Sequence, residues 1–389
     1  MLLVLFAALM TVLGSGSYWA TIQLYPLFRV NIERAALFVA LCTAVALFFL
    51  SWTARSRKAW GVPLEWDFQR LRVATWVLLG ISVVGTLVAL KRIGYIPILS
   101  GDPESARVEF PLIGGIWYRL SLLGGVVALL VAVQACARRA SWPVYVAGAA
   151  GLAAVGVYGP RYFVALPLGI SVLLWDRLRQ PIRLRWAVTA VLVLAPVAAV
   201  VGYWRERMVS VTLLRPLAQA VYGTFVEFRD LGWTLDYYAL GDRYLHGATL
   251  GSIVVPLAPS PVWRVLGIDK AAVYARNSAS ILADQMGANT WQRVGAYGEF
   301  FMNFGWPGAI IGAALYGVLL GWLDRQFGAV DNRSIGGVFF ALVIATAIFA
   351  QVGQLNMFTS SITGSAYPLL FVVLVAAHGR VTRPTGAVP

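Results

Sequence analysis

The sequence predicts an all-α polytopic membrane protein with about ten transmembrane helices. Its 389 residues are 59% hydrophobic and only 12% charged, whereas a soluble domain is about half apolar and a quarter charged. Apolar runs long enough to cross ~30 Å of hydrocarbon, at about 20 residues each, recur from one end of the chain to the other. Basic residues gather in alternate connections between these runs. Length, apolarity and charge pattern together indicate one membrane domain spanning residues 1–389.

The expected spans follow one another along the chain. They cover residues 1–19, 35–52, 73–92, 116–137, 142–158, 162–176, 185–203, 305–323, 335–352 and 363–378. The first span lacks a basic start and a clear small-residue cleavage site, so we expect a retained helix and not a signal peptide. The fifth and sixth spans are short, and Tyr158-Gly159-Pro160-Arg161 between them has the composition of a tight turn.

The charges set the expected orientation. The connections 53–72, 138–141, 177–184 and 324–334 and the C-terminal tail, together with Asp176 and Arg185 at their edges, hold 15 basic and 5 acidic residues. The positive-inside rule places them, and both termini, in the cytoplasm. The net charge of +14 then divides into +10 inside and +4 outside. Most of the excess is therefore topological, and nucleic acid is not an expected partner.

Two outer segments are longer than the other connections. Residues 93–115 form a smaller extracytoplasmic loop, and residues 204–304 form a large one between the seventh and eighth spans. A structureless loop of about 100 residues is unusual in a compact protein. The large loop is rich in Trp, Tyr, Leu and Val, so we expect it to pack on the membrane domain. Stretches such as 215–240 are candidates for helices lying near the interface.

The large loop carries individually placed arginines. It has 9 basic and 8 acidic residues, and eight of the nine are arginine: Arg205, Arg207, Arg215, Arg229, Arg243, Arg264, Arg276 and Arg293. The planar guanidinium fork suits phosphate oxygens. The alternative explanation for this preference for arginine is the base composition of the genome, because the whole chain has 28 arginines and only 3 lysines.

Two arginines outside the large loop are also candidates. Arg161 opens a short apolar span, where a charge costs a few kcal/mol and therefore usually faces a cavity or a partner. The alternative for Arg161 is that it snorkels to the outer interface. Arg107 follows Asp102 and Glu104, which suit a helix N-cap and a first-turn acid. Arg107 has no comparable structural explanation.

Two carboxylates are candidate bases. Glu299 and Asn303 have i,i+4 spacing and share a face if this stretch is helical. Gly305 and Pro307 then permit a break in the helix. A carboxylate at a membrane rim can act as a general base or pair with an arginine. The same two readings apply to Glu227.

Several site classes are not expected. The chain has two histidines, His246 and His378, which makes a zinc site improbable. Cys42 and Cys136 lie in apolar runs and form neither a metal motif nor a disulfide framework. No Walker or dinucleotide fingerprint is present, which disfavours a nucleotide-driven pump. We expect no metal and no cofactor.

Three stretches carry a family resemblance. They are Pro97-Ile-Leu-Ser with Ala106-Arg107, then Gly159-Pro-Arg161, and most specifically Gly298-Glu-Phe-Phe-Met-Asn-Phe-Gly-Trp-Pro-Gly-Ala-Ile-Ile-Gly312. The run around Glu227, the stretch Tyr244-Leu-His-Gly-Ala-Thr and the spacing from Arg276 to Gly287 add to it. The pattern resembles the oligosaccharide repeat-unit polymerases, the O-antigen polymerase (Wzy-type) family.

The resemblance implies a specific activity. Such proteins use oligosaccharide units linked to undecaprenyl pyrophosphate and build O-antigen, capsule or exopolysaccharide. They transfer the growing glycan to the incoming unit, with loss of the lipid pyrophosphate, at the outer face of the bacterial cytoplasmic (inner) membrane. The implied fold is like that of the lipid-dependent glycosyltransferases of C type. The implied partners are the lipid-linked oligosaccharide, membrane lipids and, as a further candidate, a chain-length regulator.

The resemblance also implies roles for individual residues. Arg107, Arg161, Arg276 and Arg293 would bind pyrophosphate or glycan phosphate, with Arg161 and Arg276 acting in catalysis. Glu299 or Glu227 would take the proton of the acceptor hydroxyl. The remaining expected substrate-binding residues are Trp291, Tyr297 and His246, of which the two aromatic rings would stack on sugar faces.

Two other activities remain open. A ligase would use the same lipid donor and differ in its acceptor, so the outer arginines do not separate it from a polymerase. A transporter or flippase of lipid-linked sugars should place polar groups near the bilayer midplane, often with related halves. Most of the expected spans have no polar group at their centres, and the sequence shows no internal repeat. Both observations favour a transferase over a transporter.

Overall fold

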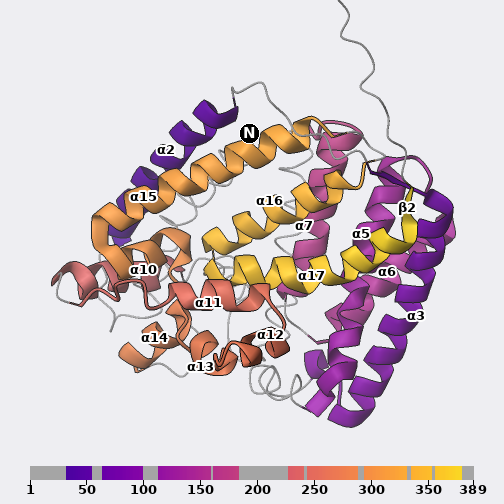
Figure 1. Ribbon diagram of the computed structural model, residues 1–389, viewed down its shortest axis with the longest axis horizontal. Coiled ribbons are helices and arrows are strands. Elements are labelled where there is room, and N and C mark those ends of the chain that lie inside the picture. The colour runs from indigo at the N-terminus through magenta and orange to yellow at the C-terminus, as the bar shows by residue number, and fades with distance from the viewer. Residues whose placement is uncertain are drawn as a thin grey trace, which may run out of the picture. The chain divides into compact units, whose positions relative to one another are not determined.

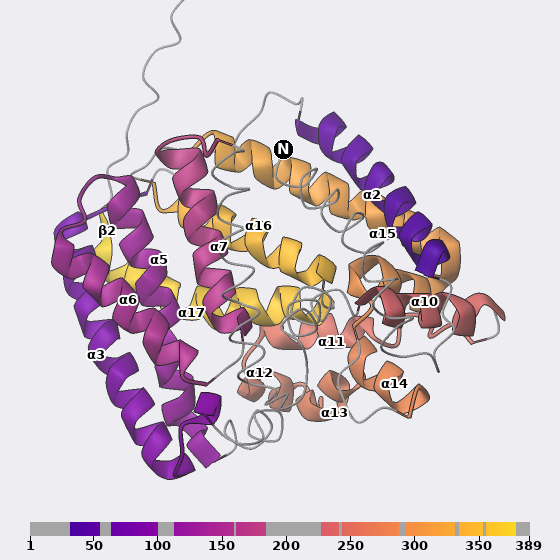
Figure 2. The same ribbon diagram turned by 180° about the vertical axis from the view of Figure 1, so that it is seen from behind.

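The computed structural model describes residues 32–54, 64–99, 113–158, 161–183, 227–240, 243–287, 293–330, 334–352 and 355–378 (Figures 1 and 2). These residues divide into two compact units. Unit 1 comprises Met1–Arg57, Ala187–Asp324 and Thr346–Thr363, and unit 2 comprises Lys58–Trp186, Arg325–Ala345 and Gly364–Pro389. The expectation of a single membrane domain stays a prediction.

Within the described part of the chain, four helices are long and apolar enough to cross a membrane. They are Glu33–Thr53, Phe68–Ile93, Ile113–Cys136 and Gly295–Gly328. Each overlaps a span expected from the sequence. The described part of the chain is mostly helical, and the length and apolarity of these four helices indicate membrane association.

Other helices also lie where spans were expected. They are α6 (Trp142–Gly156), α7 (Arg161–Leu178), α16 (Gly336–Val352) and α17 (Leu355–Ala376). The expected spans 1–19 and 185–203 lie outside the described residues, as does most of the smaller outer loop. The count of ten spans and the orientation of the termini therefore stay predictions.

Unit 2 is built around a group of packed helices. Its complete helices are α3 (Phe68–Ile93), η1 (Pro97–Leu99), α5 (Leu123–Cys136), α6 and α7. Asp67 caps the start of α3 by accepting from the backbone N–H groups of Gln69 and Arg70, at 3.0 and 3.2 Å. Gly94 ends α3 in the left-handed conformation, with φ of 82°. The sequence signals at both ends of α3 are thus ordinary helix caps.

A small sheet departs from the all-helical expectation. The two-residue strands β1 (Glu65–Trp66) and β2 (Ala377–His378) pair antiparallel within unit 2, with Glu65 opposite His378. Strands of two residues are too short to show an alternating apolar pattern, so they were not predicted from the sequence.

Unit 1 combines α2 (Ile32–Ala54) with short helices from residues 204–304, the segment that is expected to lie on the outer side and is called the outer segment below. These short helices are α10 (Glu227–Tyr237), η2 (Tyr238–Leu240), α11 (Leu250–Val254), η3 (Val255–Leu257), α12 (Ser260–Val265), α13 (Lys270–Ala275) and α14 (Ser278–Gln285). Asp269 and Asn277 cap α13 and α14 through their side-chain oxygens. The described part of this segment therefore contains helices. Its packing on a membrane domain stays a prediction.

Helix α2 runs along α15 (Gly295–Gly328) within unit 1 in both views (Figures 1 and 2). Gly317 and Gly321, four residues apart on α15, allow this close approach. A methyl group at Gly317 would meet the carbonyl oxygen of Ala46, and one at Gly321 would lie 2.6 Å from that of Leu50. Small residues at this spacing let helix backbones approach closely in membranes.

Candidate functional site

Helix α15 is broken at Gly305. This residue has φ of 65° and ψ of −155°. Glycine adopts this conformation readily, whereas it is unfavourable for any residue with a Cβ atom. The break frees backbone carbonyls that a continuous helix would use. The N–H groups of Leu245 and His246 donate to the carbonyls of Met302 and Asn303, each at 3.0 Å. The break expected at this glycine is present, and an outer-segment turn completes its hydrogen bonding.

The same turn covers the break with an aromatic ring. A Cβ atom at Gly305 would lie 2.6 Å from the hydroxyl oxygen of Tyr244. Gly247 follows with φ of 88°, which lets the chain reverse there. The part of α15 after the break, residues 306–328, is long enough to cross ~30 Å of hydrocarbon by itself. The outer segment is thereby attached to the start of a candidate span.

Glu299 lies just before the break and is completely buried, with 0% exposure. Its Oε2 atom accepts from the Ser278 hydroxyl at 3.0 Å and from the Leu355 backbone N–H at 2.9 Å. These donors come from α14 and α17, so the carboxyl group joins three helices of unit 1. Both donors are neutral groups. The stability of a buried carboxylate that is bonded to neutral groups depends on such hydrogen bonds.

Asn303 stands one helical turn after Glu299 and faces the same buried cluster. Its Nδ2 group donates to Thr249 Oγ1 at 2.7 Å and to the backbone carbonyl of Glu299 at 2.8 Å. The shared face predicted from the i,i+4 spacing is therefore present. Through Thr249, the residue that precedes α11, this bond adds a fourth segment to the cluster.

The cluster also has spare hydrogen-bonding capacity. Among the described residues, Glu299 Oε1, Asn303 Oδ1 and both amide atoms of Asn356 have no partner of good geometry. The Thr249 hydroxyl nevertheless lies near the Glu299 carboxyl group, although its geometry is not that of a hydrogen bond. Unpaired buried polar atoms each cost about 1–3 kcal/mol and are commonly retained at functional sites. We name Thr249, Ser278, Glu299 and Asn303, which these hydrogen bonds connect, the carboxylate cluster. Asn356 follows Leu355 directly in the chain.

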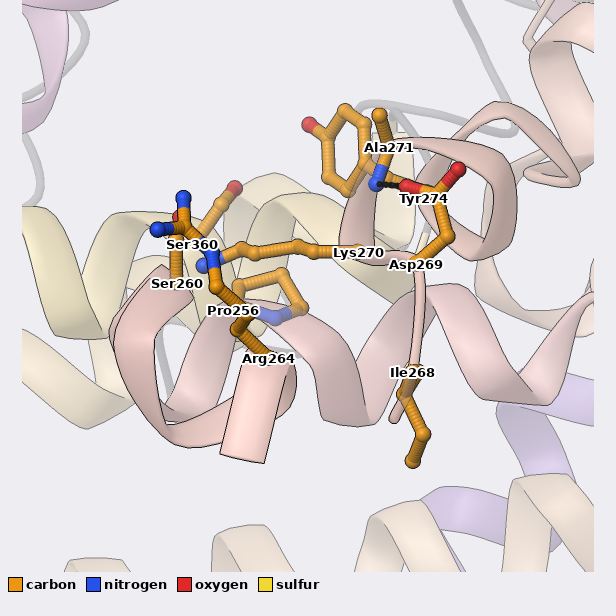
Figure 3. A pocket seen from close by; sticks show the side chains of 9 residues that line it. All are labelled: Pro256, Ser260, Arg264, Ile268, Asp269, Lys270, Ala271, Tyr274 and Ser360. Atoms are coloured by element: carbon orange, nitrogen blue, oxygen red, sulfur yellow. Dashed lines mark hydrogen bonds between the residues drawn. The ribbon is translucent and has the colours of Figure 1, made fainter. Parts of the chain in front are cut away.

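A pocket of about 660 Å³ is lined by residues of the stretch 256–274 and by Ser360 of α17 (Figure 3). It is lined by Pro256, Ser260, Arg264, Ile268, Asp269, Lys270, Ala271, Tyr274 and Ser360. The cationic groups of Arg264 and Lys270 point toward the same end of the pocket, whereas the Asp269 carboxylate points away (Figure 3). That carboxylate accepts from the Ala271 N–H at 2.9 Å. The positive charge of the pocket is therefore not neutralised by its own acid.

Other polar groups of the pocket are suited to donating hydrogen bonds. Lys270 donates to the carbonyl of Ala258 at 2.8 Å, which fixes the direction of its side chain. Burial raises the pKa of Tyr274 above its usual value, so its phenol stays a neutral donor. Ser260 and Ser360 add two hydroxyl groups. An anionic group is the ligand that such a lining fits.

Several predicted residues have side chains that are not among the members of the carboxylate cluster. Arg276 ends α13 and is exposed, as is the side chain of Arg293, whose backbone N–H donates to Asp230 at 2.9 Å. His246 is also exposed. Tyr297 is only 4% exposed. Its ring faces that of Tyr316, with centroids 6.1 Å apart, and so lies in the protein interior.

The side chains of the other predicted residues lie outside the described part of the chain. Arg107 and Trp291 lie outside the described residues. Arg161 begins α7 and Glu227 begins α10, but their side chains lie outside the described part of the chain. A common site for Arg107, Arg161, Arg276 and Arg293 stays a prediction.

Sequence reasoning did not find the partners of Glu299. Thr249, Ser278 and Leu355 lie 50, 21 and 56 residues away along the chain, and no helical spacing connects them. It also did not single out Lys270. This residue is one of three lysines in an arginine-rich chain, a rarity that would have justified attention.

Comparison of the chain with protein families, with curated proteins and with solved structures found no match. The carboxylate cluster and the pocket are therefore interpreted from their own geometry and from the sequence motifs.

Proposed function

We propose that the chain is a glycosyltransferase that polymerises oligosaccharide units linked to undecaprenyl pyrophosphate. The observation that carries this proposal is Glu299. Its motif supplies the strongest part of the family resemblance, and its carboxyl group is buried among neutral donors just before the broken span. In the proposed architecture about ten transmembrane helices form a fold like that of the C-type glycosyltransferases. The outer segment 204–304 lies on the extracytoplasmic face and holds the site.

The proposed reaction transfers the growing glycan onto an incoming unit. A hydroxyl oxygen of the incoming sugar bonds to the anomeric carbon of the donor. The bond from that carbon to the pyrophosphate oxygen breaks, and its electron pair leaves with the lipid pyrophosphate. Glu299 or Glu227 takes the hydroxyl proton.

Arginine groups would stabilise the departing pyrophosphate. Arg276 and Arg293 are exposed on the outer segment, where they can meet a ligand, and Arg107 and Arg161 are proposed to join them. A fixed donor that strengthens its bond as charge develops lowers the barrier by about 3 kcal/mol, or roughly a hundredfold in rate.

The burial of Glu299 has a consequence for this mechanism. Its carboxyl group is not exposed and is bonded to Ser278 and Leu355. To act as the base, Glu299 must become accessible to the acceptor sugar, and Oε1, which has no partner of good geometry among the described residues, is the oxygen that would take the proton. Because Ser278 lies on the short helix α14, a shift of α14 is the proposed opening movement.

The test uses purified protein in lipid nanodiscs with defined lipid-linked oligosaccharides. We expect Arg276→Ala and Arg161→Ala to lose chain extension, each by about a hundredfold. The matched control is Arg243→Ala, because Arg243 lies in the same outer segment and stacks over the ring of Tyr237, 4.7 Å from its centroid. Wild-type rates in both test variants would remove the proposed mechanism.

The products distinguish the alternatives. A ladder of repeat lengths indicates a polymerase, and a single capped product indicates a ligase that uses the same donor. Movement of the lipid-linked unit across vesicles without any new glycosidic bond indicates a transporter.

A further inference from the structure

The stretch from η3 to the start of α13 exposes apolar side chains outside every candidate span. Val265 is 87% exposed and Leu266 is 61% exposed, and Val262 and Ile268 are exposed as well. Exposed apolar residues are ordinary on membrane-spanning helices, where lipid covers them. Four of them within seven residues of an outer connection need a different apolar environment.

A basic pair accompanies these apolar side chains. Arg264 lies between Val262 and Val265 on α12, and Lys270 begins α13. Both line the pocket, and their cationic groups point toward its same end (Figure 3). The carboxylate of Asp269, the acid that lines this pocket, is occupied at the start of α13. Apolar side chains beside two cations that no carboxylate of the pocket lining neutralises match an anionic bilayer surface.

Chain connectivity holds this stretch near the start of a span. His246 and Asn303 are hydrogen-bonded through their backbones at the break of α15, and Thr249 is bonded to the Asn303 side chain. Helix α11 begins directly after Thr249, and η3 follows it without a gap. The exposed stretch therefore begins eight residues after Thr249, which is bonded next to the start of the candidate span 306–328.

An aromatic side chain fixes the local conformation. The indole N–H of Trp263 donates to the carbonyls of Val255 and Ala258, at 2.9 and 3.0 Å. These bonds tie α12 back to η3 and leave its apolar residues facing outward. Trp is also enriched at membrane interfaces, where its polar edge finds partners while its ring stays apolar.

From these observations we infer that residues 257–270 form an interfacial anchor that binds anionic phospholipid of the bilayer. In this arrangement Val265 and Leu266 enter the boundary between head groups and acyl chains. Arg264 and Lys270 pair with a lipid phosphate at the mouth of the pocket. The inference holds whether or not the chain is a polymerase, because it concerns bulk lipid and not the glycan donor.

The test places a fluorescent label at position 265 in the full-length protein. Val265→Cys is labelled and the protein is reconstituted into nanodiscs whose lipids carry a nitroxide at a shallow acyl position. Asp284→Cys is the matched control, because Asp284 is exposed on α14 of the same outer segment. Wild-type protein serves as the labelling blank, since Cys42 and Cys136 are both buried.

We expect strong quenching of the label at 265 by the acyl nitroxide and weak quenching at 284. Quenching at 265 should be stronger in discs with anionic lipid than in zwitterionic discs. Arg264→Gln with Lys270→Gln should remove that difference, because each basic residue near an anionic surface contributes about fivefold in binding.

Three results would overturn the inference. One is a label at 265 that water-soluble quenchers reach as freely as the label at 284. Another is shielding at 265 that is independent of anionic lipid, which would point to a protein partner or to purely apolar contact. The third is quenching at 265 that requires the lipid-linked glycan donor, which would assign the basic pair to the substrate.

Discussion

Replacement of Glu299 distinguishes two roles of this residue, that of a catalytic base and that of a structural link between helices. Glu299→Gln keeps an oxygen that can accept from Ser278 and from the Leu355 N–H, the two bonds that Oε2 makes at 3.0 and 2.9 Å. It removes the ability to take up a proton and places an NH2 group where one carboxyl oxygen was. Glu299→Ala removes the acceptor altogether and leaves both donors buried.

The two variants should therefore differ in stability. Each buried donor left without a partner costs about 1–3 kcal/mol, so Glu299→Ala should lose roughly 2–6 kcal/mol from its hydrogen bonds. The cavity left by the removed atoms adds to that loss. Glu299→Gln should stay within about 1–2 kcal/mol of wild type, since neutral hydrogen bonds replace those to the carboxyl group.

The assay combines unfolding in detergent, followed by tryptophan fluorescence, with chain extension in nanodiscs. We expect Glu299→Gln to unfold close to wild type but to lose extension, and Glu299→Ala to lose both. Wild-type extension by Glu299→Gln would show that Glu299 is not the base. Wild-type stability of Glu299→Ala would refute the reasoning about buried donors.

Two glycine substitutions test the packing of α15. Gly317→Ala should destabilise the contact of α2 with α15, because the new methyl group meets the Ala46 carbonyl. The control is Gly80→Ala, whose methyl group would meet no atom within 4 Å and which should be neutral or stabilising by up to about 1 kcal/mol. Equal unfolding midpoints of the two variants would contradict this. Gly305→Ala should cost at least about 1–3 kcal/mol, since it combines a positive φ of 65° with a contact to the Tyr244 hydroxyl. Thermal unfolding of this variant at the wild-type temperature would mean that the break does not need glycine.

Much of the fold follows from composition and period. Apolar runs of about 20 residues predicted the helices at 33–53, 68–93 and 113–136, because hydrocarbon thickness fixes their length. The break at Gly305 was also predictable, since glycine there precedes Pro307 in a helical pattern. The two-residue strand pair was not, because its register depends on residues that are more than 300 positions apart.

The candidate site was less predictable. The i,i+4 spacing placed Glu299 and Asn303 on one face, because that relation is local to a helix. Their other partners come from α11, α14 and α17, and only tertiary packing brings Thr249, Ser278 and Leu355 to them. The buried position of Tyr297 likewise depends on packing, which hydrophobicity along the chain does not specify.

The most direct measurement is the yield of free lipid pyrophosphate per glycosidic bond formed by purified wild-type protein. The proposed polymerase releases one undecaprenyl pyrophosphate for each unit added, because the bond from the anomeric carbon to the pyrophosphate oxygen breaks in every transfer. We predict equal amounts of the two products, together with a ladder of glycan lengths. Lipid-linked units that cross the membrane intact, with no pyrophosphate released, would contradict the account.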